Sequence, residues 1–214
     1  MCIRDRFIIA LDYLLEMAPD SPQASRWKSL REGIERNVRA HLWDEKRQKF
    51  IPHIYPEKSP IPEGFDELAI HYHGGTAIAI EAGLLSKDEI RTVNAQMLEN
   101  VRLSGMPSIG LTLYPVYPDG FFHGGMSKAY LYQNGGDWTW FGGRMIQQLV
   151  VNGMVEEAYA EIHPMIKRVI QNDGFYEWYG KGGVPSGSGN FKGSAGVLSK
   201  AIELLRDWAE KNKN

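Results

Sequence analysis

The sequence predicts an all-α domain built from helical hairpins, and two patterns carry this prediction. Apolar residues recur at helical spacing in seven segments. Tight turns alternate with long, glycine- and aromatic-rich connections at 44–67, 104–134 and 171–193. The three long connections follow the second, fourth and sixth expected helices. Because successive helices run in opposite directions, all three connections should emerge at the same end. The sequence therefore predicts a ring of hairpins with a funnel of loops at one end.

Turn-forming and capping residues mark most ends of the expected helices. Ser21 and Pro22 fit the N-cap and first turn of the second helix, and Gly83 fits the C-cap of the third. Ser86-Lys-Asp-Glu89 has the pattern of a capping box that opens the fourth helix. The helices are expected at about 7–17, 22–43, 68–82, 87–103, 137–152, 155–170 and 194–211.

The first six residues, Met1-Cys-Ile-Arg-Asp-Arg6, match what a common sequencing-library adaptor encodes. They are too short and too charged for a signal peptide, and we expect residues 1–6 to be an artefactual leader. Residues 7–214 are expected to be the C-terminal part of a single domain, because seven helices cannot close a ring of twelve. Leu11, Leu14 and Trp27 of the first hairpin should then be exposed at an open edge.

Composition excludes several classes of function. The 214 residues are 43% hydrophobic and 23% charged, with a net charge of −2, which gives no reason to expect nucleic acid or an anionic membrane as partner. No apolar run approaches the roughly 20 residues that span a bilayer. Cys2 is the only cysteine, so neither a disulfide nor a thiolate metal site is expected, and no cofactor is indicated. Cytoplasmic and exported locations remain equally compatible with this sequence.

Residues 132–141 (Tyr-Gln-Asn-Gly-Gly-Asp-Trp-Thr-Trp-Phe) and 174–179 (Gly-Phe-Tyr-Glu-Trp-Tyr) are the most informative segments. Aromatic rings stack on the apolar face of a sugar, while amides and carboxylates bind its hydroxyl groups. The alternative is a tryptophan-rich packing helix beside a chance acidic loop. Packing alone would bury these polar groups at a cost, so the pattern favours a carbohydrate site. The candidate substrate-binding residues are Tyr132, Gln133, Asn134, Asp137, Trp138, Trp140, Arg144, Trp178, Tyr179 and His73.

Several of these residues have two interpretations. Asp137 stands at an expected helix N-terminus, where the dipole stabilises a carboxylate, so it fits either hydroxyl binding or helix capping. Arg144 fits a pair with Asp137 or a contact with a carboxylate-bearing sugar. Trp138 fits the core as well as the site. His71 and His73, two residues apart on an expected helix, should not share a face, so a core or hydroxyl-binding role outweighs a metal site.

The segments Tyr132-Gln-Asn-Gly-Gly-x-Trp-x-Trp140 and Phe175-Tyr-Glu-x-Tyr179, the latter followed by Gly183-x-Pro-x-Gly-Ser-Gly-x-Phe191, resemble the six-hairpin, α/α-toroid glycosidases. Trehalases, glucoamylases, processing α-glucosidases and glycogen-debranching glucosidases belong to that group. The resemblance covers most of residues 40–205. It implies a partial α/α toroid and an inverting glycoside hydrolase in which Glu177 is the general base. It also implies that the general acid lies upstream of residue 1, in a missing N-terminal half of the domain.

Two other functions stay open on the same fold. A glycoside phosphorylase would use phosphate in place of water, and related phosphorylases share a Tyr-x-Asn-Gly-Gly-like segment. A polysaccharide lyase would need a cation that neutralises a uronate, and only Arg144 is suggestively placed. A sugar-binding protein without catalysis is the remaining alternative. A carbohydrate is the expected ligand in each case.

Overall fold

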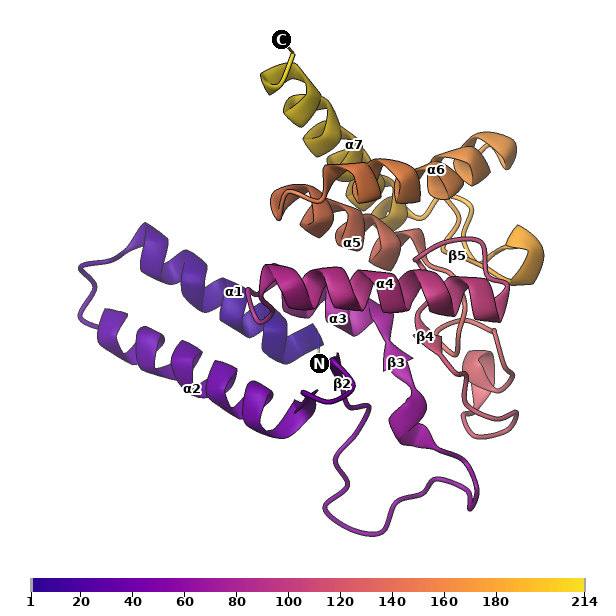
Figure 1. Cartoon of the computed structure of the whole chain (residues 1–214), viewed down its shortest axis with the longest axis horizontal. Coiled ribbons are helices and arrows are strands. Elements are labelled where there is room, and N and C mark those ends of the chain that lie inside the picture. The colour runs from indigo at the N-terminus through magenta and orange to yellow at the C-terminus, as the bar shows by residue number, and fades with distance from the viewer. Residues whose placement is uncertain (1, 214) are drawn as a thin grey trace.

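The computed structural model describes residues 2–213, and within this range the chain folds into seven α-helices with little sheet (Figure 1). The all-α prediction is confirmed. The helices are α1 (Cys2–Met17), α2 (Ala24–Leu42), α3 (His73–Glu81), α4 (Lys87–Ser104), α5 (Thr139–Val151), α6 (Val155–Gln171) and α7 (Lys192–Lys211). Short 3-10 helices occur at η1 (Glu67–Ala69), η2 (Gly124–Met126) and η3 (Lys181–Gly183).

Six two-residue strands form three small antiparallel pairs in the described range. They are β1 (Trp43–Asp44) with β2 (Lys49–Phe50), β3 (His71–Tyr72) with β4 (Leu113–Tyr114), and β5 (Trp178–Tyr179) with β6 (Pro185–Ser186). Strand β3 explains why the start of the third helix was misplaced by several residues. The third helix was expected from residue 68, but η1 and β3 occupy that stretch and α3 begins at His73.

The capping box predicted from Ser86-Lys-Asp-Glu89 is present. The Ser86 hydroxyl accepts a hydrogen bond from the Glu89 backbone N–H at 3.3 Å, and the Ser86 backbone N–H donates to the Glu89 carboxylate at 2.8 Å. Gly105, in the left-handed conformation with φ 68°, ends the same helix. Local sequence therefore fixes both ends of α4, because each end satisfies its own unpaired backbone groups.

Helix α1 begins at Cys2, so residues expected to be a leader extend the first helix. The Arg6 guanidinium donates to both oxygens of Glu81 in α3, at 2.8 and 3.0 Å. The first hairpin is also less exposed than predicted. Leu11 is buried and Trp27 is half-buried, whereas Leu14 is exposed as expected. Leu11 was mispredicted because α1 packs against α3 as well as α2.

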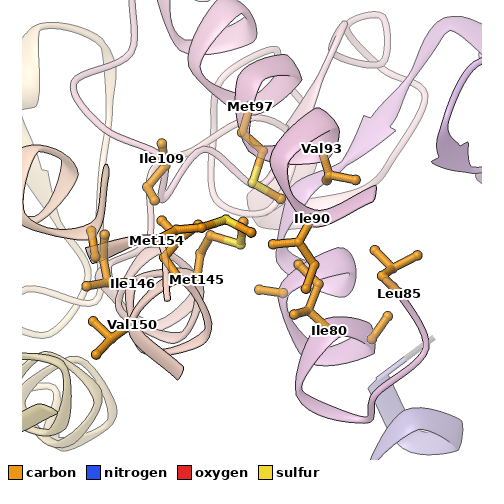
Figure 2. Packing of buried hydrophobic residues seen from close by; sticks show 14 of the residues in the cluster. Ile80, Leu85, Ile90, Val93, Met97, Ile109, Met145, Ile146, Val150 and Met154 are labelled. Carbon is orange, nitrogen blue, oxygen red and sulfur yellow. The ribbon is translucent and has the colours of Figure 1, made fainter. Parts of the chain in front are cut away.

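One apolar core runs through the helices, and α5 lies near its centre, packed against α3, α6 and α7. Figure 2 shows Ile90 and Met97 of α4 facing Met145 of α5 and Met154 of the turn after it. Burial of each such side chain contributes roughly 1.5–3 kcal/mol relative to exposure. Gly142 lets α5 approach its surroundings closely, because a Cβ there would lie 2.9 Å from the Gly110 backbone nitrogen.

The three long connections meet at one end, as predicted. The Tyr117 hydroxyl donates to Glu67 at 2.6 Å and joins the second connection to the first. Backbone hydrogen bonds of 2.9 and 2.8 Å between Asp137 and Tyr179 join the start of α5 to the third. In Figure 1 these loops lie along the lower and right-hand side of the view. Among the described residues, no helix combines the length and apolar character needed to cross a bilayer.

Candidate active site

Glu177 lies in the third connection, just before the β5–β6 hairpin. Its backbone N–H donates to the Ser188 carbonyl at 2.9 Å, which holds the two arms of this connection together. The Tyr132 hydroxyl donates to the Glu177 carboxylate at 3.4 Å, and the Tyr132 and Trp178 rings meet edge to face with centroids 6.3 Å apart. The structure thus brings Tyr132, Glu177 and Trp178 together.

Gly187 closes the third connection over the Glu177 carboxylate. It has φ 72°, a conformation that favours glycine, and a Cβ at this position would lie 2.4 Å from Glu177 Oε2. Any side chain at position 187 would therefore collide with the Glu177 carboxylate. Glu177 itself is half-buried, so it is partly shielded from solvent.

Gln133 contributes to a cavity on the other side of the same segment. The cavity has a volume of about 260 Å³ and is lined by Pro52, His53, Tyr72, Gly74, Gly75, Thr112, Gln133 and Phe141. Gly74 is required where α3 begins, since a Cβ would lie 2.5 Å from the Phe141 ring. The Gln133 side chain is exposed, in contrast to the residues that follow it.

Asn134 and Trp138 were predicted to bind substrate, but both side chains are buried. The Asn134 amide accepts from the Tyr117 backbone N–H at 2.9 Å and donates to the Tyr117 carbonyl at 3.1 Å, so it fastens the second connection. The Trp138 indole donates to the Tyr132 carbonyl at 3.2 Å. Both residues support the segment that carries Tyr132 and do not face a cavity.

Asp137 is fully buried and lies 2.8 Å from Arg168 of α6. Burial raises the pKa of Asp137, while Arg168 and the Ser108 hydroxyl lower it. The predicted pair with Arg144 is wrong, and Asp137 does not cap α5 either, since Trp138 occupies the N-cap position without a side-chain cap bond. Tyr179 is also buried, with the Arg168 guanidinium 4.0 Å from its ring centre. Asp137 and Tyr179 therefore belong to the interior.

Arg144 and Trp140 form part of the packing among α3, α5 and α7. The Arg144 guanidinium lies 3.2 Å from Glu81 and 4.4 Å from the centre of the Trp140 ring. A Cβ at Gly193 in α7 would lie 2.9 Å from Trp140 Cδ1. Trp140 is half-buried, and neither residue lines the cavity beside Gln133. Their positions fit a structural role better than direct sugar stacking.

His71 and His73 were expected on different faces of one helix, and this was wrong. His71 lies in β3 and His73 begins α3, so their rings stack with centroids 6.1 Å apart. Burial lowers the pKa of His71 to about 4 and that of His73 to about 3. His73 also lies 3.1 Å from the Asn100 amide, so it is a neutral core histidine that does not reach a ligand. Residues 2–213 contain no group of three or more potential metal ligands.

Sequence reasoning missed a hydrogen-bonded cluster around the Glu67 carboxylate, beside the cavity. Its Oε1 atom lies 2.6 Å from the Tyr117 hydroxyl, 2.7 Å from His53 Nδ1 and 2.9 Å from the Tyr55 hydroxyl. Burial raises the pKa of Glu67, but these hydrogen bonds outweigh it and leave the pKa below its ordinary value. The sequence around Glu67 does not reveal this cluster, because the three partners lie 14, 12 and 50 residues away along the chain. The only local signal was the His-x-Tyr pair in the proline-rich loop.

No family model and no curated protein sequence matches the chain. Solved structures do match its fold. GH63 mannosylglycerate hydrolase from Thermus thermophilus, in complex with Tris and D-glycerate, matches with a TM-score of 0.62 and 16% identity over 95% of this chain and 44% of that one. Its complex with glucose gives 0.62 and 17% over 91% and 43%. An uncharacterized conserved protein from the same organism gives 0.63 and 16% over 95% and 46%.

The chain thus spans less than half the length of these similar structures. At this level of identity the likeness establishes the fold alone, a partial all-α toroid. The predicted partial toroid is confirmed.

Proposed function

We propose that this chain forms part of an inverting glycoside hydrolase in which Glu177 activates the attacking water. The observation that carries the proposal is the half-buried Glu177 carboxylate beside the Tyr132 hydroxyl, at the end of the fold where the three connections meet. The similar solved structures include a hydrolase that acts on mannosylglycerate, a small glycoside, which supports this class of reaction.

The chemistry requires two carboxyl groups with different tasks. Glu177 takes a proton from water, and the water oxygen bonds to the anomeric carbon from the face opposite the leaving group. A carboxylic acid gives its proton to the departing oxygen as the glycosidic bond breaks. The two groups stand roughly 6.5–9.5 Å apart so that water fits between one of them and the sugar. Tyr132, a hydrogen-bond donor to Glu177, fixes the carboxylate for this task.

Neither nearby carboxyl group within the described residues suits the role of acid. Asp137 is sealed in the interior with Arg168 and cannot reach a substrate. Glu67 accepts three hydrogen bonds that lower its pKa, so it lacks the proton that an acid must give. We therefore propose that the acid comes from polypeptide outside these 214 residues, in the rest of the toroid. The limited coverage of the similar structures supports this.

The two alternatives receive less support. A phosphorylase needs a phosphate site, yet none of the eight residues that line the cavity beside Gln133 is a lysine or arginine. A lyase needs a cation for the uronate, and Arg144 is already held by Glu81 and Trp140. Hydrolysis of an uncharged glycoside agrees best with these positions.

The test is kinetic and uses the chain together with the upstream half of its domain. Glu177→Gln should lower kcat by roughly 10³-fold or more with little change in KM, because water activation matters only in the transition state. Azide should partly restore cleavage and give an inverted product, identified by proton NMR. Glu57→Gln, an exposed carboxylate of the first connection, is the matched control and should change kcat less than about two-fold.

Retention of most activity by Glu177→Gln would refute the role of the base. Clear glycosidase turnover by the 214-residue chain alone would refute an external acid. Release of a sugar phosphate, seen only when inorganic phosphate is added, would favour the phosphorylase instead.

A further inference from the structure

We propose that the cavity between His53 and Gln133 is a second sugar subsite, which binds an uncharged pyranose unit through His53. This inference rests on the proposed function, since it assigns the ring next to the one at Glu177. His53 and Glu67 were not recognised from the sequence. Glu67 is the positioning residue, and His53 is the group that meets the ligand.

Glu67 carries a negative charge that its hydrogen bonds hold in a fixed position. Its Oε1 atom receives hydrogen bonds from Tyr117 and Tyr55 at 2.6 and 2.9 Å, and the carboxylate is nearly buried. Tyr117 is itself held rigidly, because Phe121 stacks on its ring with centroids 4.8 Å apart. A carboxylate with several donors stays ionised even when shielded from water. Glu67 therefore presents a fixed negative charge to its third neighbour, His53.

Glu67 sets the orientation of the His53 ring. Its Nδ1 atom lies 2.7 Å from Glu67 Oε1, so this nitrogen carries a hydrogen. A carboxylate on one ring nitrogen fixes the tautomer and turns the other nitrogen away from it. The Tyr55 and Tyr72 rings lie against the imidazole, with centroids 5.6 and 6.0 Å distant. Since the His53 side chain is 42% exposed and lines the cavity, Nε2 is available to a hydroxyl group.

The other residues that line the cavity offer polar and aromatic groups but no charge. The Thr112 hydroxyl donates to the Gln133 carbonyl at 2.9 Å and fixes the backbone from which the Gln133 amide extends. Tyr72 and Phe141 add aromatic surface, which suits the apolar face of a sugar. None of the eight lining residues is Lys, Arg, Asp or Glu. An uncharged, hydroxyl-rich ring fits this lining better than a phosphate or a uronate.

The cavity also suits one sugar ring in its size and in its position along the chain. The volume of about 260 Å³ is below the roughly 300–1,000 Å³ of sites for drug-sized ligands, so the cavity suits one ring. Gln133 directly follows Tyr132, whose hydroxyl contacts Glu177. We assign the two places to adjacent units of one glycoside, so that the His53 cavity selects an uncharged neighbour of the cleaved residue.

The experiment measures binding to the 214-residue chain by saturation-transfer NMR and by shifts of ¹⁵N-labelled amides. The probes are methyl α-D-glucopyranoside and methyl α-D-mannopyranoside, with glucuronate and inorganic phosphate as charged comparisons. At least one methyl glycoside should bind in the millimolar range and shift the amides of residues 53 and 133. His53→Ala and Gln133→Ala should each weaken binding by about five-fold or more, at a thermal midpoint close to the wild type.

Glu67→Gln tests the positioning role. It should weaken binding and change the ¹⁵N signature of the His53 ring, because the carboxylate that fixes the tautomer is gone. Glu57→Gln is the matched control, since it neutralises an exposed carboxylate of the same connection and leaves His53, Glu67 and the cavity lining in place. It should retain binding within about two-fold. Unchanged ring nitrogens in Glu67→Gln would refute the positioning role.

The subsite itself is refuted if neither methyl glycoside binds, if His53→Ala binds like the wild type, or if phosphate or glucuronate binds better than both glycosides. These outcomes are separate from the test of Glu177. Glycoside binding that depends on His53 can stand even if Glu177→Gln keeps its turnover, and loss of turnover in Glu177→Gln can stand even if the His53 cavity proves not to bind sugars.

Discussion

Arg168 of α6 lies 2.8 Å from the carboxylate of Asp137, and both side chains are buried. Arg168 also donates to the Thr139 hydroxyl at 2.6 Å. The Ser108 hydroxyl approaches Asp137 from the other side, at 2.7 and 2.9 Å. Through these contacts one ion pair joins the second connection, the start of α5 and the last turn of α6. We expect these contacts to hold the segment that carries Tyr132 in place.

Arg168→Met should therefore lower the free energy of unfolding by roughly 3–5 kcal/mol, because it leaves the Asp137 charge buried without its partner. Urea unfolding of the 214-residue chain, followed by circular dichroism, measures the change. Arg91→Met is the control, since Arg91 pairs with Asp88 on the surface and such a pair contributes less than about 1 kcal/mol. Equal losses in both variants would contradict a special role for the buried pair.

Tyr132→Phe should lower kcat roughly ten-fold in the assembled enzyme while KM changes little, since the hydroxyl that donates to Glu177 is lost. Burial and the Glu177 charge raise the pKa of Tyr132, so its hydroxyl keeps the hydrogen that it donates. Steady-state kinetics on the hydrolysed glycoside provide the measurement. Tyr130→Phe is the control, because a phenylalanine ring still packs under Lys181, 3.7 Å from the Tyr130 ring centre. A comparable loss in this control would remove the case for Tyr132.

Glu161→Gln should stabilise the chain above neutral pH. Burial raises the pKa of Glu161 from 4.5 to about 7, although the Asn94 amide donates to its Oε1 atom at 2.7 Å. Within the described residues, Glu161 Oε2 and Asn94 Oδ1 are both buried without a hydrogen-bond partner. A glutamine at this position carries no charge at any pH, so its burial does not oppose folding above neutral pH. The free energy of unfolding at pH 8 should rise by roughly 2 kcal/mol.

The sign of the pH dependence follows from proton uptake. Between about pH 4.5 and 7 the folded state keeps a proton on Glu161 that the unfolded state releases, so wild-type stability due to this group falls as pH rises. The advantage of Glu161→Gln should hence be smaller at pH 5 than at pH 8. Glu203→Gln, on the exposed face of α7, should show no such difference. Equal effects of Glu161→Gln at both pH values would disprove the raised pKa.

Ser86→Ala should lower the free energy of unfolding by about 1 kcal/mol, because it removes the hydroxyl that accepts from the Glu89 backbone N–H. Chemical denaturation measures the loss. Ser199→Ala serves as the control, because Ser199 is exposed to solvent and lies away from both ends of α7. This change should be neutral or slightly stabilising. A similar loss at both serines would mean that the cap contributes nothing of its own.

The sequence by itself determined what depends on neighbouring residues. Helical spacing gave the helices and the loop end of the fold, and Ser86 with Glu89 marked the start of α4 because both partners lie within one turn. The sequence also singled out the two short motifs that contain Tyr132, Glu177 and Trp178, because both combine aromatic with polar residues. These features need only local geometry, or the general rule that alternating loops share one end.

The tertiary structure alone decided which polar residues face inward. Asn134 and Gln133 are adjacent in sequence, yet Asn134 fastens a loop and Gln133 lines a cavity. Asp137 pairs with Arg168 of a different helix, and Glu67 gathers His53 and Tyr117 from separate connections. A buried charge or amide must satisfy its hydrogen bonds with whatever groups the packing brings near it. Those partners are chosen by distance in space, which residue spacing along one chain does not specify.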